Sequence, residues 1–410
     1  MTDANQYARL ESDLQQLAQY TEEPARKGVT RRLYSSQWAA AQRHIARLMR
    51  AEGLEQWIDA VGNVHGRVEG RSHRTILTGS HFDTVHGGGT YDGMYGIVAG
   101  IMAVSQIRKR VAVPEKSLEV VAFCEEEGSR FPITCWGSRA ILGAASPDES
   151  GLLSDDQGIT LFDAMRMHGL DPEAILDARR KDYDAFIELH VEQGLELETA
   201  QCSIGVVSGI FGQERWMVTL TGDSAHAGTT RMARRHDALV AASAMVLAIN
   251  TVAYRYETVA AATVGTLEVV HGSVNCVPGR VKFSIDFRAA DDAVRQTLAV
   301  EIRQMIEREA SKCGVKVTIV PQTVVNAVSM EESLRQIVRK SAFSYGLPQM
   351  PVASRAGHDA QMMAYAVPTA MIFVPSYQGL SHHPDEYTHR QHLINGSVVL
   401  ESTLDKLANG

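Results

Sequence analysis

The stretch GSHFDTVHGGGTYDG, residues 79–93, follows a short apolar run at Thr75–Thr78 and leads into a helical pattern over 92–110. A short apolar run followed by a loop and a helix predicts a buried strand of an α/β sheet. The loop would then lie beyond the carboxyl end of that strand, where open α/β sheets bind ligands. Its three consecutive glycines would let the backbone fold back, so that Asp92 could share a metal centre with His81. The alternative is that the glycines serve only a tight turn and that Asp92 only caps the helix.

Three further apolar runs end in the same kind of residues. Leu118–Cys124 leads into Glu125-Glu126-Glu127-Gly128, Ala185–Leu189 into His190-Val191-Glu192-Gln193, and Thr369–Val374 through a loop to Ser381-His382-His383. A lone histidine is usually an ordinary core or surface residue, and three glutamates usually mark an exposed face. Four strand ends that meet at one sheet edge instead predict a metal site. Imidazole and carboxylate ligands suit zinc, manganese, cobalt or nickel, and a bridging carboxylate could hold two ions.

Length and composition exclude several other classes. The chain has 410 residues, so two structural units are expected. Its 40 basic and 48 acidic side chains give a formal charge of -8, which argues against a nucleic-acid-binding surface. Five scattered cysteines do not suggest a disulfide framework. No signal-peptide pattern or apolar run of about 20 residues is found, so we expect a cytoplasmic protein without a membrane partner.

The order of patterns predicts an α/β domain interrupted by an insertion. From residue 208 to 325 the order is strand, helix, two strands, helix and strand, which is typical of a ferredoxin-like α+β sandwich. The α/β pattern occupies residues 1–207 and resumes over 326–410. Within its first part we expect a helix over Gln37–Met49, followed by a β-hairpin about Gly62-Asn63.

Several motifs together resemble a known family. They are GSHFDTVHGGGTYDG, EEEGSRFP, ELHVEQG, GDSAHAGTTRM, NCVPGRVKFSIDFR, AGHDAQM and GLSHHPDE. In this order they are similar to the dinuclear-metal amidohydrolases related to aminoacylases and metallo-carboxypeptidases. The match is to the branch of allantoate amidohydrolases, N-carbamoyl-L-amino acid hydrolases and β-ureidopropionases. The resemblance implies a dinuclear metallopeptidase-like catalytic domain with an inserted lid or dimerisation domain, and hence a homodimer.

The resemblance also implies a ligand set for two divalent ions. His81 and His190 would hold one ion, Glu127 and His382 the other, and Asp92 would bridge them. Two alternatives stay open, in which Glu126 and Glu127 exchange roles or His383 replaces His382.

Further roles follow from the same resemblance. Glu126 would be the general base that takes a proton from the water between the metals, and Asp83 would orient His81. His358 and Asp359 would support the site or cap a helix rather than bind metal.

The remaining implied residues would bind the substrate. His226 would reach the active site of a partner subunit and stabilise the oxyanion. Arg288 would bind the substrate carboxylate, while Asn275 and Gln193 would hydrogen-bond to its polar groups. Arg288 could instead be a surface ion-pair residue, and Asn275 part of a turn. Arg231 stands where relatives usually have proline, which leaves the rigidity of the His226 loop open.

The resemblance implies hydrolysis of a ureido C–N bond in a small acid. The segments GVTRRLYSSQW, EEEGSRFPITCWGSR and GQER favour allantoate, which would give ureidoglycine, ammonia and carbon dioxide in purine nitrogen salvage. The alternative substrate is an N-carbamoyl-L-amino acid. A non-catalytic binding protein on the same fold is a weaker alternative, because every expected metal position is filled. A general peptidase is also weaker, because the motifs SAHAGTT and EEEGSRFP do not support it.

Overall fold

The structure, a computed structural model, describes residues 4–410, with side chains from residue 9 onward. The chain divides into two compact units, Met1–Ser208 with Ser329–Gly410, and Gly209–Val328. Each unit has its own hydrophobic core. Within the described residues, no helix combines the length and apolar character needed to cross a membrane.

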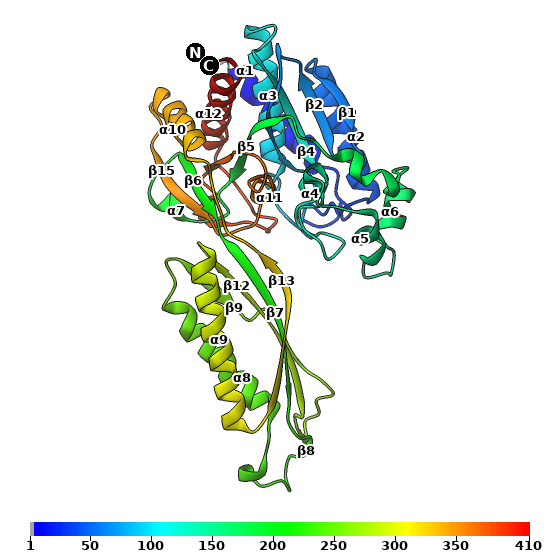
Figure 1. Cartoon of the computed structure of the whole chain (residues 1–410), viewed down its shortest axis with the longest axis vertical. Helices are drawn as coiled ribbons and strands as arrows, with labels where there is room; N and C mark the ends of the chain where they lie inside the picture. Colours follow the sequence, from blue (N-terminus) through cyan, green and yellow to red (C-terminus); the bar gives the residue numbers. More distant parts are fainter. Residues whose placement is uncertain (1–3) are drawn as a thin grey trace. The chain divides into compact units, whose positions relative to one another are not determined.

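The first unit is built on a mixed sheet (Figure 1). Its strands run in the order β1 (Glu55–Ile58), β2 (Val64–Val68), β4 (Lys116–Phe123), β3 (Ser72–His81), β5 (Tyr183–Val191), β16 (Thr369–Val374), β6 (Ile204–Ile210) and β14 (Val328–Ser329), and β15 (Gln349–Ser354) pairs with β6. The four central strands β4, β3, β5 and β16 are parallel. Their carboxyl ends therefore meet at one edge, as the sequence predicted. The predicted hairpin is also present, because β1 pairs antiparallel with β2.

Helices accompany this sheet. They are α1 (Ala4–Ala18), α2 (Ser36–Ala51), α3 (Met94–Arg110), α4 (Trp136–Leu142), α5 (Pro147–Leu152), α6 (Leu161–Met167), η1 (Pro172–Ala178), α7 (Glu196–Thr199), α10 (Glu332–Ser344), α11 (Asp359–Met363), η3 (Tyr377–Gly379) and α12 (Arg390–Asn409). Ser35 caps α2, since its side chain accepts a hydrogen bond from the Trp38 N–H.

Helix α3 explains why the residues after the glycine loop are so apolar. Most of its side chains are buried, and it packs against β3, β4, β5 and α12, so it needs no polar face. At Gly96 an added Cβ would lie 2.3 Å from the Leu189 carbonyl oxygen, so only glycine allows α3 to approach β5 this closely. The helix begins at Met94 rather than at the predicted Asp92, because Gly93 adopts a positive φ of 64°.

The second unit has a five-stranded antiparallel sheet in the order β10 (Leu267–Val269), β12 (Arg280–Ala289), β7 (Gly212–Thr221) and β13 (Lys316–Val325), with β9 (Ala260–Thr263) also pairing with β12. Helices α8 (Ala238–Tyr254) and α9 (Asp292–Cys313) pack on it (Figure 1). This strand order is that of a ferredoxin-like sandwich.

Shorter elements complete the second unit. They are β8 (Ala225–His226), η2 (Met232–Arg234) and β11 (Cys276–Val277). The expectation of only two strands between the two helices of this unit was too simple. The chain forms β9 and β10 against β12 and places β11 against β8, because turns interrupt the alternating pattern.

Candidate metal centre

Two groups of potential metal ligands share one carboxylate at the carboxyl edge of the first unit's sheet. His81, Asp92 and His190 form one group, and Asp92, Glu127 and His382 form the other. Within each group the potential ligand atoms all lie within 4.8 Å of one another. The structure thus brings together the five side chains that the resemblance assigned to two ions.

The sheet supplies these side chains from its four central strands. His81 is the last residue of β3, His190 lies near the end of β5, Glu127 follows β4, and His382 follows β16. Asp92 comes from the glycine-rich loop before α3. Beside it, a Cβ at Gly93 would lie 2.4 Å from the His81 carbonyl oxygen and 2.6 Å from its ring, so a side chain there would displace this ligand.

Hydrogen bonds direct both imidazoles of the first group. His190 Nδ1 lies 2.8 Å from the Val191 carbonyl oxygen, and His81 Nδ1 lies 3.2 Å from the Asp83 carbonyl oxygen. Each Nδ1 therefore carries the proton, and each Nε2 presents a lone pair. The two Nε2 atoms lie 3.1 Å (His190) and 3.4 Å (His81) from Asp92 Oδ1.

Asp92 Oδ1 is buried and has no hydrogen-bond partner among the described residues. With the imidazole protons held at Nδ1, an electron-rich carboxylate oxygen faces two electron-rich nitrogens. A cation satisfies all three, so the residues present fit a divalent metal ion.

Asp83 connects two of the strand ends. Its Oδ1 accepts a hydrogen bond from the Glu126 N–H at 2.9 Å, and its Oδ2 accepts one from the Glu127 N–H at 3.2 Å. Asp83 Oδ1 also lies 3.3 Å from His81 Nδ1. The carboxylate is therefore placed to orient the segment that carries Glu126 and Glu127, as well as the imidazole.

The geometry distinguishes the two adjacent glutamates. Glu127 Oε1 lies 3.3 Å from His382 Nε2, and Glu127 belongs to the group that contains Asp92. Glu126 instead forms a group with His81 and Glu127. The Cys135 thiol lies 3.5 Å from Glu126 Oε1 as a hydrogen-bond donor. This arrangement favours Glu127 as the ligand and leaves Glu126 beside the centre as a proton acceptor.

Burial and charge shape the ionisation of these carboxyls. Burial raises the pKa of Glu126 well above its usual range, and the neighbouring Glu127 adds to the effect. Burial also acts to raise the pKa of Asp92, but the imidazoles of His190 and His81, when they are protonated in place of a bound cation, outweigh it and hold that pKa well below its usual range. A buried carboxylate is costly unless positive charge balances it.

The neighbouring histidines are arranged differently. His383 Nδ1 accepts a hydrogen bond from the Asp385 N–H at 3.1 Å, within its own loop, whereas His382 lies beside Asp92 and Glu127. His358 forms a further group with Glu188 and His190, but its Nε2 is already 2.9 Å from Ser354 Oγ. The contact with Ser354 favours a role for His358 in holding the site together rather than in binding metal.

Several functional contacts were not foreseen from the sequence. Gln193 Nε2 donates to Asp92 Oδ2 and to Ser381 Oγ, each over 3.0 Å, so this amide contacts the shared carboxylate. Glu386 accepts hydrogen bonds from the backbone N–H groups of Tyr91 and Asp92. Its position four residues after His382 could have indicated a role at the site. However, a glutamate that follows Asp385 in a turn has the sequence context of an exposed residue.

Two motif arginines have structural contacts. Arg31, in GVTRRLY, is buried and donates to the carbonyl oxygens of Leu17, Tyr20 and Phe82. Arg130, in EEEGSRFP, donates to Asp155 and to the carbonyl oxygens of Leu33 and Tyr34. These contacts give both arginines a structural role that does not require a bound substrate.

The second unit holds the other predicted substrate-binding residues. His226 and Asn275 are close, because His226 pairs with Cys276 and the Ala227 N–H donates to the Asn275 carbonyl oxygen. His226 Nδ1 accepts hydrogen bonds from the Gly228 and Thr229 N–H groups at 3.0 and 3.2 Å. Its proton is therefore on Nε2, which becomes the donor.

The loop that carries His226 is tied by an arginine. Arg235 donates to the carbonyl oxygens of Ala227 and Thr230, the residue before Arg231. These bonds constrain the loop next to Arg231.

Arg288 lies on β12 beside Asp286, with 3.0 Å between Arg288 Nε and Asp286 Oδ1. Gln213 and Arg215 of the GQER segment also donate to Asp286. Because this cluster belongs to the second unit, its action on the first unit's metal centre stays a prediction.

Comparison with known proteins gives consistent matches. The model of the peptidase family M20/M25/M40 matches residues 58–406. The chain is 39% identical to allantoate amidohydrolase of Bacillus subtilis (strain 168), covering 96% of this chain and 95% of that protein. It is 36% identical to N-carbamoyl-L-amino acid amidohydrolase of Geobacillus stearothermophilus, with 98% of both covered. A crystal structure of an amidase of the hydantoinase/carbamoylase family from Burkholderia multivorans matches with a TM-score of 0.88 and 32% identity over 98% of both chains.

Proposed function

The chain belongs to the peptidase family M20/M25/M40, and on that premise we propose that it is an allantoate amidohydrolase that uses two divalent ions, Zn²⁺ or Mn²⁺. The enzyme is a hydrolase, and its reaction cleaves a ureido C–N bond. The observation that carries this proposal is the pair of ligand groups that share Asp92, with Glu126 directly beside them. The 39% identity to an allantoate amidohydrolase over nearly the whole chain supports the substrate.

Water attacks the ureido carbonyl carbon, and Glu126 accepts the proton of that water at a carboxylate oxygen. The two ions supply Lewis acidity, which polarises the carbonyl and lowers the pKa of water. Glu126 then delivers the proton to the departing nitrogen. This cleavage leaves a carbamic acid, which releases carbon dioxide when its remaining C–N bond breaks. One ureido group and one water thus give the amine, ammonia and carbon dioxide, so that allantoate yields ureidoglycine.

The protein's other residues bind and orient the substrate. His226 donates its Nε2 proton to the oxygen on which negative charge develops. Arg288 binds the carboxylate with its guanidinium group, and Asn275 and Gln193 hydrogen-bond to the substrate's polar groups. Asp83 keeps Glu126 and Glu127 in position through their backbone N–H groups.

A substrate panel tests the proposal. Chelator-treated protein is reloaded with Mn²⁺ or Zn²⁺ and assayed for ammonia release from allantoate and from N-carbamoyl-L-amino acids. We expect turnover of allantoate to be the faster. Brisk turnover of an N-carbamoyl-L-amino acid with none of allantoate would instead support the second candidate, which the 36% identity to such an enzyme favours.

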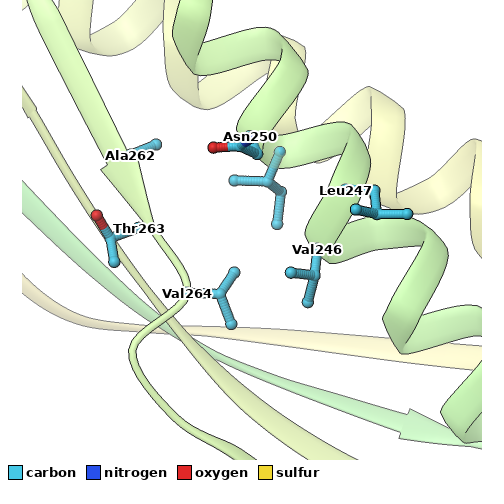
Figure 2. A pocket seen from close by; sticks show the side chains of 7 residues that line it. Val246, Leu247, Asn250, Ala262, Thr263 and Val264 are labelled. Atoms are coloured by element: carbon cyan, nitrogen blue, oxygen red, sulfur yellow. The ribbon is translucent and has the colours of Figure 1, made fainter.

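We propose that the enzyme is a homodimer that associates through its second unit, in the cytoplasm. Helix α8 exposes Val240, Leu247 and Tyr254, with 58%, 71% and 68% of their surfaces accessible. A pocket of about 290 Å³ lies between α8 and β9, lined by Val246, Leu247, Asn250, Ala262, Thr263 and Val264 (Figure 2). Exposed apolar surface of this kind marks interfaces. Light scattering should give twice the chain mass, and a monomer at micromolar concentration would contradict the proposal.

A further inference from the structure

Glu386 joins two segments that are almost 300 residues apart in the sequence. Its Oε1 accepts a hydrogen bond from the Tyr91 N–H at 2.9 Å and another from the Asp92 N–H at 3.2 Å. Glu386 is buried, and the same short segment carries His382 and Ser381. Ser381 Oγ lies 3.3 Å from Asp92 Oδ2 as a donor. The segment after β16 therefore contacts both the backbone and the side chain of Asp92: Glu386 binds the backbone, and Ser381 binds the carboxylate.

The glycine-rich loop is shaped around this glutamate. A Cβ at Gly89 would lie 2.2 Å from Glu386 Cδ and 2.5 Å from Glu386 Cβ. The second atom is next to the backbone, so the clash could not be relieved by rotating the end of the side chain. Gly89 does not have a positive φ, so its need for glycine comes from this contact and not from backbone strain.

We propose that Glu386 is a positioning residue for the metal centre, acting through Asp92, and that Gly89 is kept small to admit it. Without the carboxylate, the N–H groups of Tyr91 and Asp92 would lose their acceptor, and a buried donor without an acceptor destabilises the conformation that buries it. The loop would move to regain one. The Asp92 carboxylate, whose Oδ1 faces His81 Nε2 and His190 Nε2, would then leave the position in which both ligand groups share it.

This inference rests on the proposed metal centre, so its test measures metal binding and loop protection rather than turnover. Calorimetric titration of chelator-treated protein with Zn²⁺ should show about 10–100-fold weaker binding in Glu386→Ala. Hydrogen exchange of the metal-free protein should be faster at residues 86–93. Glu386→Gln, whose amide oxygen can still accept both bonds, should stay close to the unaltered protein in both measurements.

A double-mutant cycle separates the positioning role of Glu386 from a general loss of stability. Gly89→Ala should weaken Zn²⁺ binding in the unaltered background, but it should add little in the Glu386→Gly background, because glycine at 386 removes both the Cδ and the Cβ with which the new methyl group would clash. Asp155→Ala is the matched control for Glu386→Ala. Asp155 also accepts two backbone N–H bonds, from Gln157 and Ile159, in another loop. It should leave Zn²⁺ affinity unchanged.

Several outcomes would overturn the inference. Unchanged Zn²⁺ affinity and unchanged exchange at residues 86–93 in Glu386→Ala would exclude a positioning role, as would equal effects of Gly89→Ala in both backgrounds. If Glu386→Ala does not fold, Gly89→Ala and Glu386→Gln carry the comparison. If the unaltered protein binds no divalent ion, the proposed function fails. The positioning of the Asp92 loop by Glu386 is still tested by hydrogen exchange at residues 86–93.

Discussion

The carboxylate of Asp83 accepts a hydrogen bond from the backbone N–H of Glu126 over 2.9 Å. The bond joins the loop after β3 to the loop after β4, and a second bond to the Glu127 N–H strengthens the junction. Hydrogen bonds from backbone donors to a charged acceptor are among the stronger ones in proteins. The proposed base and a proposed metal ligand are therefore positioned by a residue that belongs to a different strand.

Asp83→Asn should lower both kcat and metal affinity by about 10–100-fold. The asparagine oxygen can replace one acceptor, but its NH₂ group would face the other backbone N–H as a second donor. Steady-state kinetics and Zn²⁺ titration measure the two effects. Asp155→Asn serves as the control, and a kcat equal to that of the unaltered enzyme would show that the junction is not needed.

Glu126→Gln should lower kcat by about 10²–10⁴-fold while the protein still binds two ions, because the amide cannot accept the proton of water. Glu127→Gln should instead weaken the binding of one ion. Metal analysis after dialysis, paired with kinetics, separates the two. The reverse pattern would mean that the two glutamates exchange roles.

His226→Ala should lower kcat by about 10²–10³-fold, as expected for loss of an oxyanion donor. Since Nδ1 accepts two backbone bonds, only Nε2 can donate. The amide nitrogen of glutamine lies near the place of Nε2, whereas that of asparagine lies nearer Nδ1. His226→Gln should therefore keep more activity than His226→Asn, and equal activities would contradict the proposed donor.

Arg288→Ala should raise KM for allantoate by about 10–100-fold, because a hydrogen bond to a charged group contributes about 1.5–3 kcal/mol. Asp286 keeps its bonds from Gln213 and Arg215, so the sheet should stay folded. Initial rates over a range of allantoate concentrations give KM. An unchanged value would exclude carboxylate binding by Arg288.

His65 should make stability depend on pH. Burial acts to lower its pKa, but hydrogen bonds to Asp59 and Glu119 outweigh it and raise the pKa to about 9. Because this is above the value of about 6.5 in the unfolded chain, the stabilisation is complete below pH 6.5 and is lost as pH rises through 9. It is on the order of 3 kcal/mol.

The measurement for His65 is the urea midpoint of metal-free protein at pH 6.5 and pH 9.5. His65→Gln is the control, since its midpoint should change less over this interval. Identical changes in the two proteins would show that other groups cause the pH dependence.

Local patterns predicted those parts of the fold that depend on neighbours in the sequence. The parallel strands, helix α2, the hairpin of β1 and β2, and helices α8 and α9 follow from apolar periodicity and caps, which act over a few residues. The short elements α4 to α6 and the strand β15 were not foreseen, because in such short segments long-range packing outweighs local preference.

The sequence by itself determined which chemistry is present. Histidines and carboxylates end four strands, and the rule that parallel strands share a carboxyl edge implied that they meet. The tertiary structure alone decided where each neighbour of a pair lies relative to the other ligands. Glu127 rather than Glu126 lies beside His382, and the buried Glu386 holds the Asp92 loop. Adjacent residues have nearly identical sequence context, and only the path of the folded backbone, with the acceptors available to each N–H, determines which ligand each of them lies beside.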